Sequence, residues 1–105
     1  RQPLNRPDAL ADVIRKHDQV ERVLCGHLHR SIQARFANTL AMSCPGVSHQ
    51  VSLDLTPNGP AHFQLEPTGY LLHHWSATHG TVTHQGFIDQ YPGPFPFYDE
   101  NGLID

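Results

Sequence analysis

Turn-forming residues divide most of this chain into short runs, and this division restricts it to a β-rich fold with little helix. The chain has 105 residues, of which nine are prolines and eight are glycines. Residues 1–7 (RQPLNRP) are predicted to be an irregular lead-in. Helical spacing of apolar side chains occurs at residues 7–17, where Pro7 occupies a favourable first-turn position. We therefore expect one amphipathic helix near the start.

The remainder of the chain favours strands. They are expected at residues 20–25, 31–37, 40–43, 49–55, 62–66, 70–75 and 81–88. In residues 49–55 (HQVSLDL) the alternation predicts a strand with Val51, Leu53 and Leu55 on one face. The nearly continuous apolar run Val23–Cys25 predicts burial on both faces. Short turns between consecutive strands favour antiparallel pairing. The predicted fold class is α+β, with one helix followed by five to six mainly antiparallel strands.

Composition excludes several functions. All seven Lys and Arg residues lie in residues 1–35, and residues 51–105 carry only acidic charges, so a nucleic-acid partner is not expected. No apolar run approaches the ~20 residues that a membrane helix needs, and no signal peptide is recognisable, so we expect no membrane partner and a cytoplasmic protein. The first residue is Arg1 rather than Met, which suggests a processed product or a fragment.

The sharpest chemical feature is Gly26-His27-Leu28-His29, directly after an apolar strand. Two neutral imidazoles two residues apart can reach toward one region of space and bind first-row metals. Gly26 would remove a side chain where the backbone leaves the sheet, so that both rings approach an ion closely. On spacing alone, two ordinary loop histidines remain an alternative.

Three segments carry a resemblance to a known family. Residues 23–29 (VLCGHLH) resemble the last signature of the calcineurin-like metallophosphoesterases. Residues 40–51 (LAMSCPGVSHQV) are similar to the segment that follows it in class III cyclic-nucleotide phosphodiesterases and bacterial glycerophosphodiesterases. Residues 93–100 (GPFPFYDE) are similar to the tail of the glycerophosphodiesterase branch. Together they cover the C-terminal third of such an enzyme.

The resemblance implies a binuclear metal-dependent phosphodiesterase that acts on cyclic nucleotides or glycerophosphodiesters. His27 and His29 would bind different ions of a pair, with iron, manganese, zinc or cobalt as candidates. The upstream Asp-x-His and Asn-His signatures of the family do not occur here. The parent protein would be an enzyme, and the isolated chain is expected to be inactive and to need the remaining N-terminal part as a partner.

The same resemblance implies a single C-terminal segment, residues 1–105, of an α/β metallophosphoesterase sandwich. Residues 1–57 would be the catalytic-core portion and residues 58–105 would complete the sheet and form an oligomer-building or capping tail. The aromatic side chains of this tail suggest a partner surface, and a homo-oligomer is expected. The rival hypothesis is a non-catalytic β-rich interaction module whose histidines are incidental or hold a structural zinc.

Other histidines and the cysteines are weighed separately. His49 is either structural or a second contact near the metals or the substrate phosphate. His73 and His74 would point to opposite faces of a strand, and His62, His79 and His84 lack partner spacing. Cys25 and Cys44 are either buried free thiols, a disulfide, or part of a structural zinc site with His27 and His29.

Overall fold

The computed structural model describes residues 6–103, so most of the predicted lead-in lies outside the described residues. The helix α1 (Pro7–Arg15) is confirmed, and it ends two residues before the predicted position. Pro7 begins it, and the charges of Asp8 and Arg15 complement the partial charges at its two ends. Ala11 and Ile14 are the side chains that it buries.

Nine short strands follow within residues 6–103. Their bounds are β1 (Arg22–Cys25), β2 (Ile32–Phe36), β3 (Thr39–Ser43), β4 (Gln50–Val51), β5 (Phe63–Gln64), β6 (Gly69–Ser76), β7 (Gly80–Phe87), β8 (Tyr98–Asp99) and β9 (Gly102–Leu103). They form one three-stranded sheet and three two-stranded ribbons, and all pairs except β1 with β3 are antiparallel. The predicted α+β class with mainly antiparallel strands is therefore confirmed.

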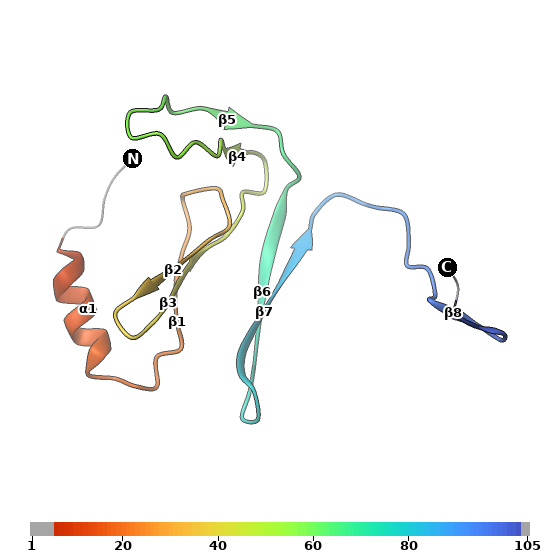
Figure 1. Cartoon of the computed structure of the whole chain (residues 1–105), viewed down its shortest axis with the longest axis horizontal. Coiled ribbons are helices and arrows are strands. Elements are labelled where there is room, and N and C mark those ends of the chain that lie inside the picture. Colours follow the sequence, from red (N-terminus) through yellow and green to blue (C-terminus); the bar gives the residue numbers. More distant parts are fainter. Residues whose placement is uncertain (1–5, 104–105) are drawn as a thin grey trace.

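The three-stranded sheet has the order β1-β3-β2, which determines where the following loops lie. Cys25 and Ile32, at the two ends of the loop 26–31, both pair with Ser43 at the end of β3. The loop therefore passes over the carboxyl end of β3, and residues 44–49 leave the sheet at the same edge. Figure 1 shows this sheet between α1 and the long ribbon formed by β6 and β7.

The β6–β7 ribbon is attached to the start of β1 by two adjacent side chains. The carboxylate of Glu21 accepts hydrogen bonds from the backbone N–H of Thr81, at 2.7 Å, and from Nε1 of Trp75, at 3.0 Å. Arg22 donates from Nη2 to the carbonyl oxygen of Thr81 at 3.0 Å. These polar contacts fix the tip of the ribbon against the sheet.

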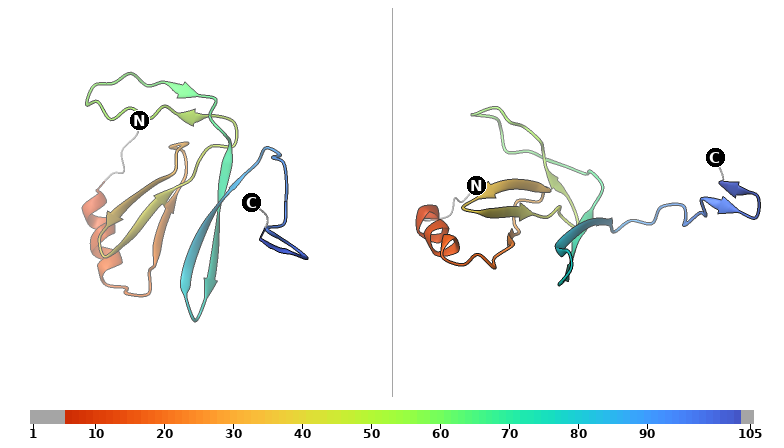
Figure 2. Two further views of the ribbon diagram at one scale, coloured as in Figure 1. Left: turned by 45° about the vertical axis from the view of Figure 1, so that its right-hand side comes forward. Right: turned by 60° about the horizontal axis from the view of Figure 1, so that its bottom comes forward.

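The chain as a whole is open, with little core of its own. The buried apolar side chains among the described residues are Ala11, Ile14 and Met42. The radius of gyration is 18.2 Å, whereas a compact chain of this length has about 13 Å. The accessible surface is 8794 Å², against about 5900 Å² for a compact monomer of 11.8 kDa. Residues 88–103 extend away from the sheets as an arm (Figure 2).

This openness explains two predictions that were wrong. Residues 49–55 form only the two-residue strand β4, because β5 offers two pairing residues, and Leu53 and Leu55 are 66% and 90% exposed. The apolar run in β1 is not buried on both faces, since Leu24 is 53% exposed. The arm carries the small β8–β9 ribbon, which was not among the predicted strands.

The two long strands and the turns around them were predicted closely. The expected strands 70–75 and 81–88 correspond to β6 and β7. Between β4 and β5 the chain turns at residues 57–58, where the Gly59 N–H donates to the carbonyl of Thr56. The turn between β2 and β3 lies at residues 37–38, one residue earlier than expected, and Ala37 there has a φ of 55°. No helix of residues 6–103 is long and apolar enough to cross a membrane.

Candidate functional site

The Gly26–His29 loop lies where β1 and β3 both end, beside the segment that follows β3. Ligands in open sheets with parallel strands bind outside the carboxyl ends of those strands. His27 and His29 both have left-handed backbone conformations, with φ of 74° and 50°. Each such conformation costs about 1–3 kcal/mol in a non-glycine residue, so the surrounding contacts must hold the loop in place.

Several hydrogen bonds hold the far end of this loop. The carbonyl oxygen of His29 accepts from the backbone N–H of Val51 at 2.9 Å, and the hydroxyl of Ser43 donates to the carbonyl of Arg30 at 2.6 Å. The Arg30 side chain donates to the carbonyl of Val51 at 2.7 Å and forms an ion pair with Glu66 at 2.5 Å. The backbone around His29 is therefore tied to β3, β4 and the residues after β5.

The ring of His29 has a defined orientation. Its Nδ1 lies 3.2 Å from the carbonyl oxygen of His49. A carbonyl oxygen can only accept, so this hydrogen bond requires the proton on Nδ1 and leaves the lone pair on Nε2. The rings of His29 and His49 are 4.5 Å apart between centroids, and the His49 ring contacts Phe63 edge-on at 5.2 Å. A metal-ligating histidine commonly has this arrangement, with the other ring nitrogen bonded to a carbonyl.

Gly46 is the glycine that makes room for His29. A Cβ at Gly26 would meet no described atom within 4 Å, so the expected role of Gly26, close approach of both rings to an ion, stays a prediction. A Cβ at Gly46 would lie 2.1 Å from the carbonyl oxygen of His49 and 2.8 Å from Nδ1 of His29. Gly46 therefore allows the approach of these two histidines.

The structure thus brings His29 and His49 together, while His27 is exposed on the same loop. Within residues 6–103, no group of three or more His, Cys, Asp or Glu side chains is arranged to hold a metal ion. The structural zinc site considered above, with Cys25, Cys44 and the two histidines, therefore lacks a ligand set there. Both cysteines are free, and Cys25 is exposed rather than buried as predicted.

The remaining histidines lie elsewhere. His73 is bonded through Nδ1 to the hydroxyl of Thr83 at 2.8 Å, and the neighbouring His74 is exposed on the opposite face of β6, as expected. Exposed positions are also found for His62, His79 and His84.

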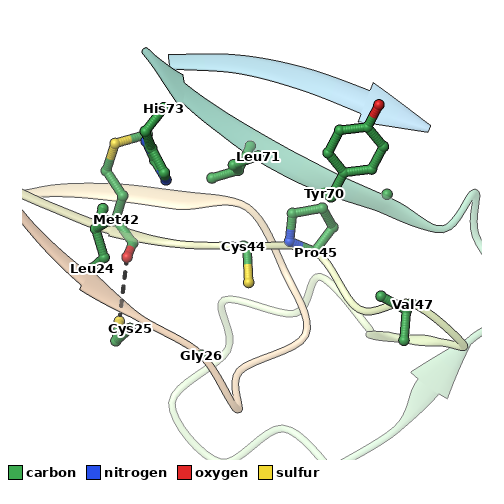
Figure 3. A pocket seen from close by; sticks show the side chains of 11 residues that line it. Leu24, Cys25, Gly26, Met42, Cys44, Pro45, Val47, Tyr70, Leu71 and His73 are labelled. Atoms are coloured by element: carbon green, nitrogen blue, oxygen red, sulfur yellow. Dashed lines mark hydrogen bonds between the residues drawn. The ribbon is translucent and has the colours of Figure 1, made fainter. Parts of the chain in front are cut away.

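A pocket of about 360 Å³ lies between the sheet and β6 and is separate from the histidine pair. Leu24, Cys25, Met42, Cys44, Leu71 and His73 are among its lining residues (Figure 3). His27, His29 and His49 do not line it.

Two residues that adjoin His29 and His49, Gln50 and Gly46, were not predicted from the sequence. Neither glutamine nor glycine has a spacing pattern that marks a position beside a candidate metal ligand.

Comparison with known proteins finds a curated relative. No family model matches the chain. It is similar to a phosphodiesterase, which confirms the resemblance to part of a metallophosphoesterase. The relative is a probable glycerophosphodiester phosphodiesterase, GpdQ, of Arcobacter nitrofigilis, and it is 39% identical over 99 residues. That match includes 93% of this chain, while the chain spans about a third of the relative's length, 36%.

Proposed function

We propose that this chain supplies His27 and His29 as metal ligands to a binuclear, metal-dependent phosphodiesterase. The observation that carries the proposal is the hydrogen bond from Nδ1 of His29 to the His49 carbonyl, which leaves Nε2 as a free ligand atom. Imidazole nitrogen suits iron, manganese, zinc and cobalt alike, so the donor set fits the expected metals without selecting one. The similarity to a phosphodiesterase supports the same function.

The chain holds only part of such a centre. A bound pair of ions would supply positive charge that polarises a phosphate ester and neutralises its oxygens. Two imidazoles are too few ligands for two ions, and residues 6–103 offer no third group beside them. The remaining ligands would come from the remainder of the enzyme, which is therefore the proposed partner of this chain. Alone, the chain would not be catalytic.

His49 has a second role in the proposal. Its ring centroid lies 4.5 Å from that of His29, with the two ring planes tilted by 35°, and its Nδ1 lies 3.0 Å from the Ser48 hydroxyl. The ring is half-buried and sits beside the ligand rather than on a separate surface. It would support His29 from the second shell of the metal centre and contact the substrate phosphate.

For the substrate, glycerophosphodiesters are the favoured class over cyclic nucleotides. This preference rests on the name of the relative, a probable glycerophosphodiester phosphodiesterase, and on the similarity of residues 93–100 to that branch. Both classes contain a phosphodiester, so the proposed metal chemistry is the same for either. The two classes are therefore distinguished by comparing the hydrolysis of a glycerophosphodiester with that of a cyclic nucleotide.

The test compares the isolated chain with a chimera. In the chimera, the 99-residue homologous segment of the Arcobacter protein is replaced by that of this chain. We expect the chimera to hydrolyse bis(4-nitrophenyl) phosphate and glycerophosphodiesters in the presence of manganese or zinc, and the chain alone to hydrolyse neither. A folded chimera that binds two ions but shows no hydrolysis would contradict the proposal.

The interaction-module hypothesis is favoured by one observation, the large accessible surface of the chain, on which many apolar side chains are exposed. The excess over a compact monomer is roughly 2900 Å², which is in the range buried in obligate interfaces. Under this hypothesis a separate protein would cover the surface, whereas under the enzyme hypothesis the remainder of the enzyme and a second copy of the chain would cover it. Both hypotheses thus require association, and only the metal and hydrolysis measurements separate them.

A further inference from the structure

We propose that Gln50 is the positioning residue for His29: its buried side-chain amide holds the His49 carbonyl against Nδ1 of His29 and so keeps Nε2 available to a metal. This inference rests on the proposed function for its metal-binding consequence. The positioning itself concerns only residues of this chain, and it is measurable without a metal.

Gln50 is a polar side chain with nearly all of its surface buried. Its exposed fraction is 4%, and it lies in the two-residue strand β4. Burial of an amide is unfavourable unless its oxygen and nitrogen are both hydrogen-bonded. Here the oxygen accepts from the Gly46 N–H at 2.7 Å, and the nitrogen donates to the Gly46 carbonyl at 2.9 Å and to the Pro67 carbonyl at 3.3 Å.

These three bonds close the segment 46–50 into a ring. The two bonds to Gly46 join the first residue of the segment to its last, and the bond to Pro67 ties the ring to the chain before β6. Gly69 adds a further tie, because its N–H donates to the Gly46 carbonyl at 3.2 Å. We call the hydrogen bonds of the Gln50 side chain to Gly46 and Pro67 the Gln50 clamp. His49 lies within the closed segment, so the clamp determines the direction of its carbonyl.

The clamp and the His29 ring are close to each other beside Gly46. The position of a Cβ on Gly46 would be 2.1 Å from the His49 carbonyl oxygen and 2.8 Å from Nδ1 of His29. The carbonyl oxygen and Nδ1 are themselves 3.2 Å apart. Any displacement of segment 46–50 therefore moves the acceptor that selects the His29 tautomer.

The consequence for metal binding follows from the tautomer. With the proton on Nδ1, the Nε2 lone pair is free, whereas the other tautomer would place a lone pair against the carbonyl oxygen. Loss of an outer-shell partner of a metal-ligating histidine weakens metal binding by about 10–100-fold. Loss of the Gln50 amide should have an effect of this size at one of the two metal positions.

The experiment uses the 105-residue chain and long-range ¹H–¹⁵N correlation of the imidazole rings at about pH 8.5, where histidines are neutral. We expect the Nδ1–H form for His29 in the wild type. Gln50→Met removes all three hydrogen bonds at similar length, and it should give a mixture of the two tautomers. His84, exposed on β7, should keep its wild-type spectrum and serves as an internal reference.

A matched control and a second variant complete the test. Gln64 pairs directly with Gln50 in the β4–β5 ribbon but is exposed, so Gln64→Met should leave His29 unchanged. Gln50→Glu keeps an acceptor for the Gly46 N–H and loses both donated bonds, so it should also mix the tautomers. An Nε2–H form in the wild type, or unchanged His29 spectra in both Gln50 variants, would overturn the inference.

A metal titration of the chimera separates this inference from the proposed function. Gln50→Met should weaken one of two zinc-binding events by about 10–100-fold and leave the other unchanged. If His29→Ala does not affect zinc binding, the proposed function fails while the tautomer result remains valid. If His29→Ala abolishes one site and Gln50→Met leaves both affinities unchanged, the positioning role fails and the proposed function stands.

Discussion

Trp75 donates a hydrogen bond from its indole nitrogen to the carboxylate of Glu21 at 3.0 Å, although 54 residues separate the two in sequence. The same carboxylate accepts from the Thr81 backbone at 2.7 Å, so one side chain joins both strands of the β6–β7 ribbon to β1. A Cβ at Gly80 would lie 2.5 Å from Oε1 of Glu21. The attachment of the ribbon therefore depends on a charge at Glu21 and on the absence of a side chain at Gly80.

The Glu21 contacts predict an acid-dependent detachment of the ribbon. The hydrogen bond from the Thr81 backbone, with help from the Trp75 indole, lowers the pKa of Glu21 below its ordinary value. Because the pKa is lower in the folded state, the stabilisation is fully present above the ordinary value of about 4.3 and is lost as the pH falls through the lowered folded value.

Trp75 is the single tryptophan, so its fluorescence reports this event directly. We expect the emission to change as the pH falls below about 4 in the wild type. Glu21→Gln should remove this transition and give the detached spectrum at neutral pH, while Glu100→Gln, at an exposed position of the arm, should behave as the wild type. An identical acid transition in the wild type and Glu21→Gln would show that another group is responsible.

Two glycines close to the histidines should respond differently to alanine. At Gly46 a methyl group would overlap the His49 carbonyl and the His29 ring, and overpacking of this kind costs about 1–3 kcal/mol. At Gly26 a methyl group would meet no described atom, so the change in the free energy of unfolding should be within about 0.5 kcal/mol. Urea denaturation of the two variants measures the difference. Equal destabilisation by both would contradict the assignment of Gly46 as the glycine that makes room for His29.

The aromatic arm predicts self-association. Tyr91, Phe95, Phe97 and Tyr98 are 54–75% exposed, and large aromatic side chains favour burial in an interface. We propose a second copy of the chain as the occupant. Sedimentation should show a larger mass for the intact chain than for one that lacks residues 91–105. An unchanged mass and unchanged stability after the truncation would remove this proposal.

The sequence predicted the elements that local patterns determine. The helix begins at Pro7, and the β6–β7 ribbon follows two strand-favouring runs joined by a short turn, so each carries its own signal. The strand expected at residues 49–55 shows where this reasoning stops. Its alternation is clear, but a strand extends only as far as a partner pairs with it, and here β5 pairs with two residues.

The candidate site was predicted only in part, because contacts between segments that are distant in sequence have no local signal. His27 and His29 stand out because of their spacing. The contact between His29 and His49 depends on the register of the three-stranded sheet, which brings the loop 26–31 and residues 44–49 to one edge. Gln50 has no local signal, because its role arises from a closed ring of hydrogen bonds that only the fold creates.

We propose above all that His27 and His29 bind different ions of a metal pair. The most direct test is the number of metal ions per chimera, measured by elemental analysis after dialysis, for the wild-type segment, His27→Ala, His29→Ala and the control His84→Ala. The account predicts two ions for the wild type and the control and one for each of the other two variants. Two ions in both His27→Ala and His29→Ala would contradict it.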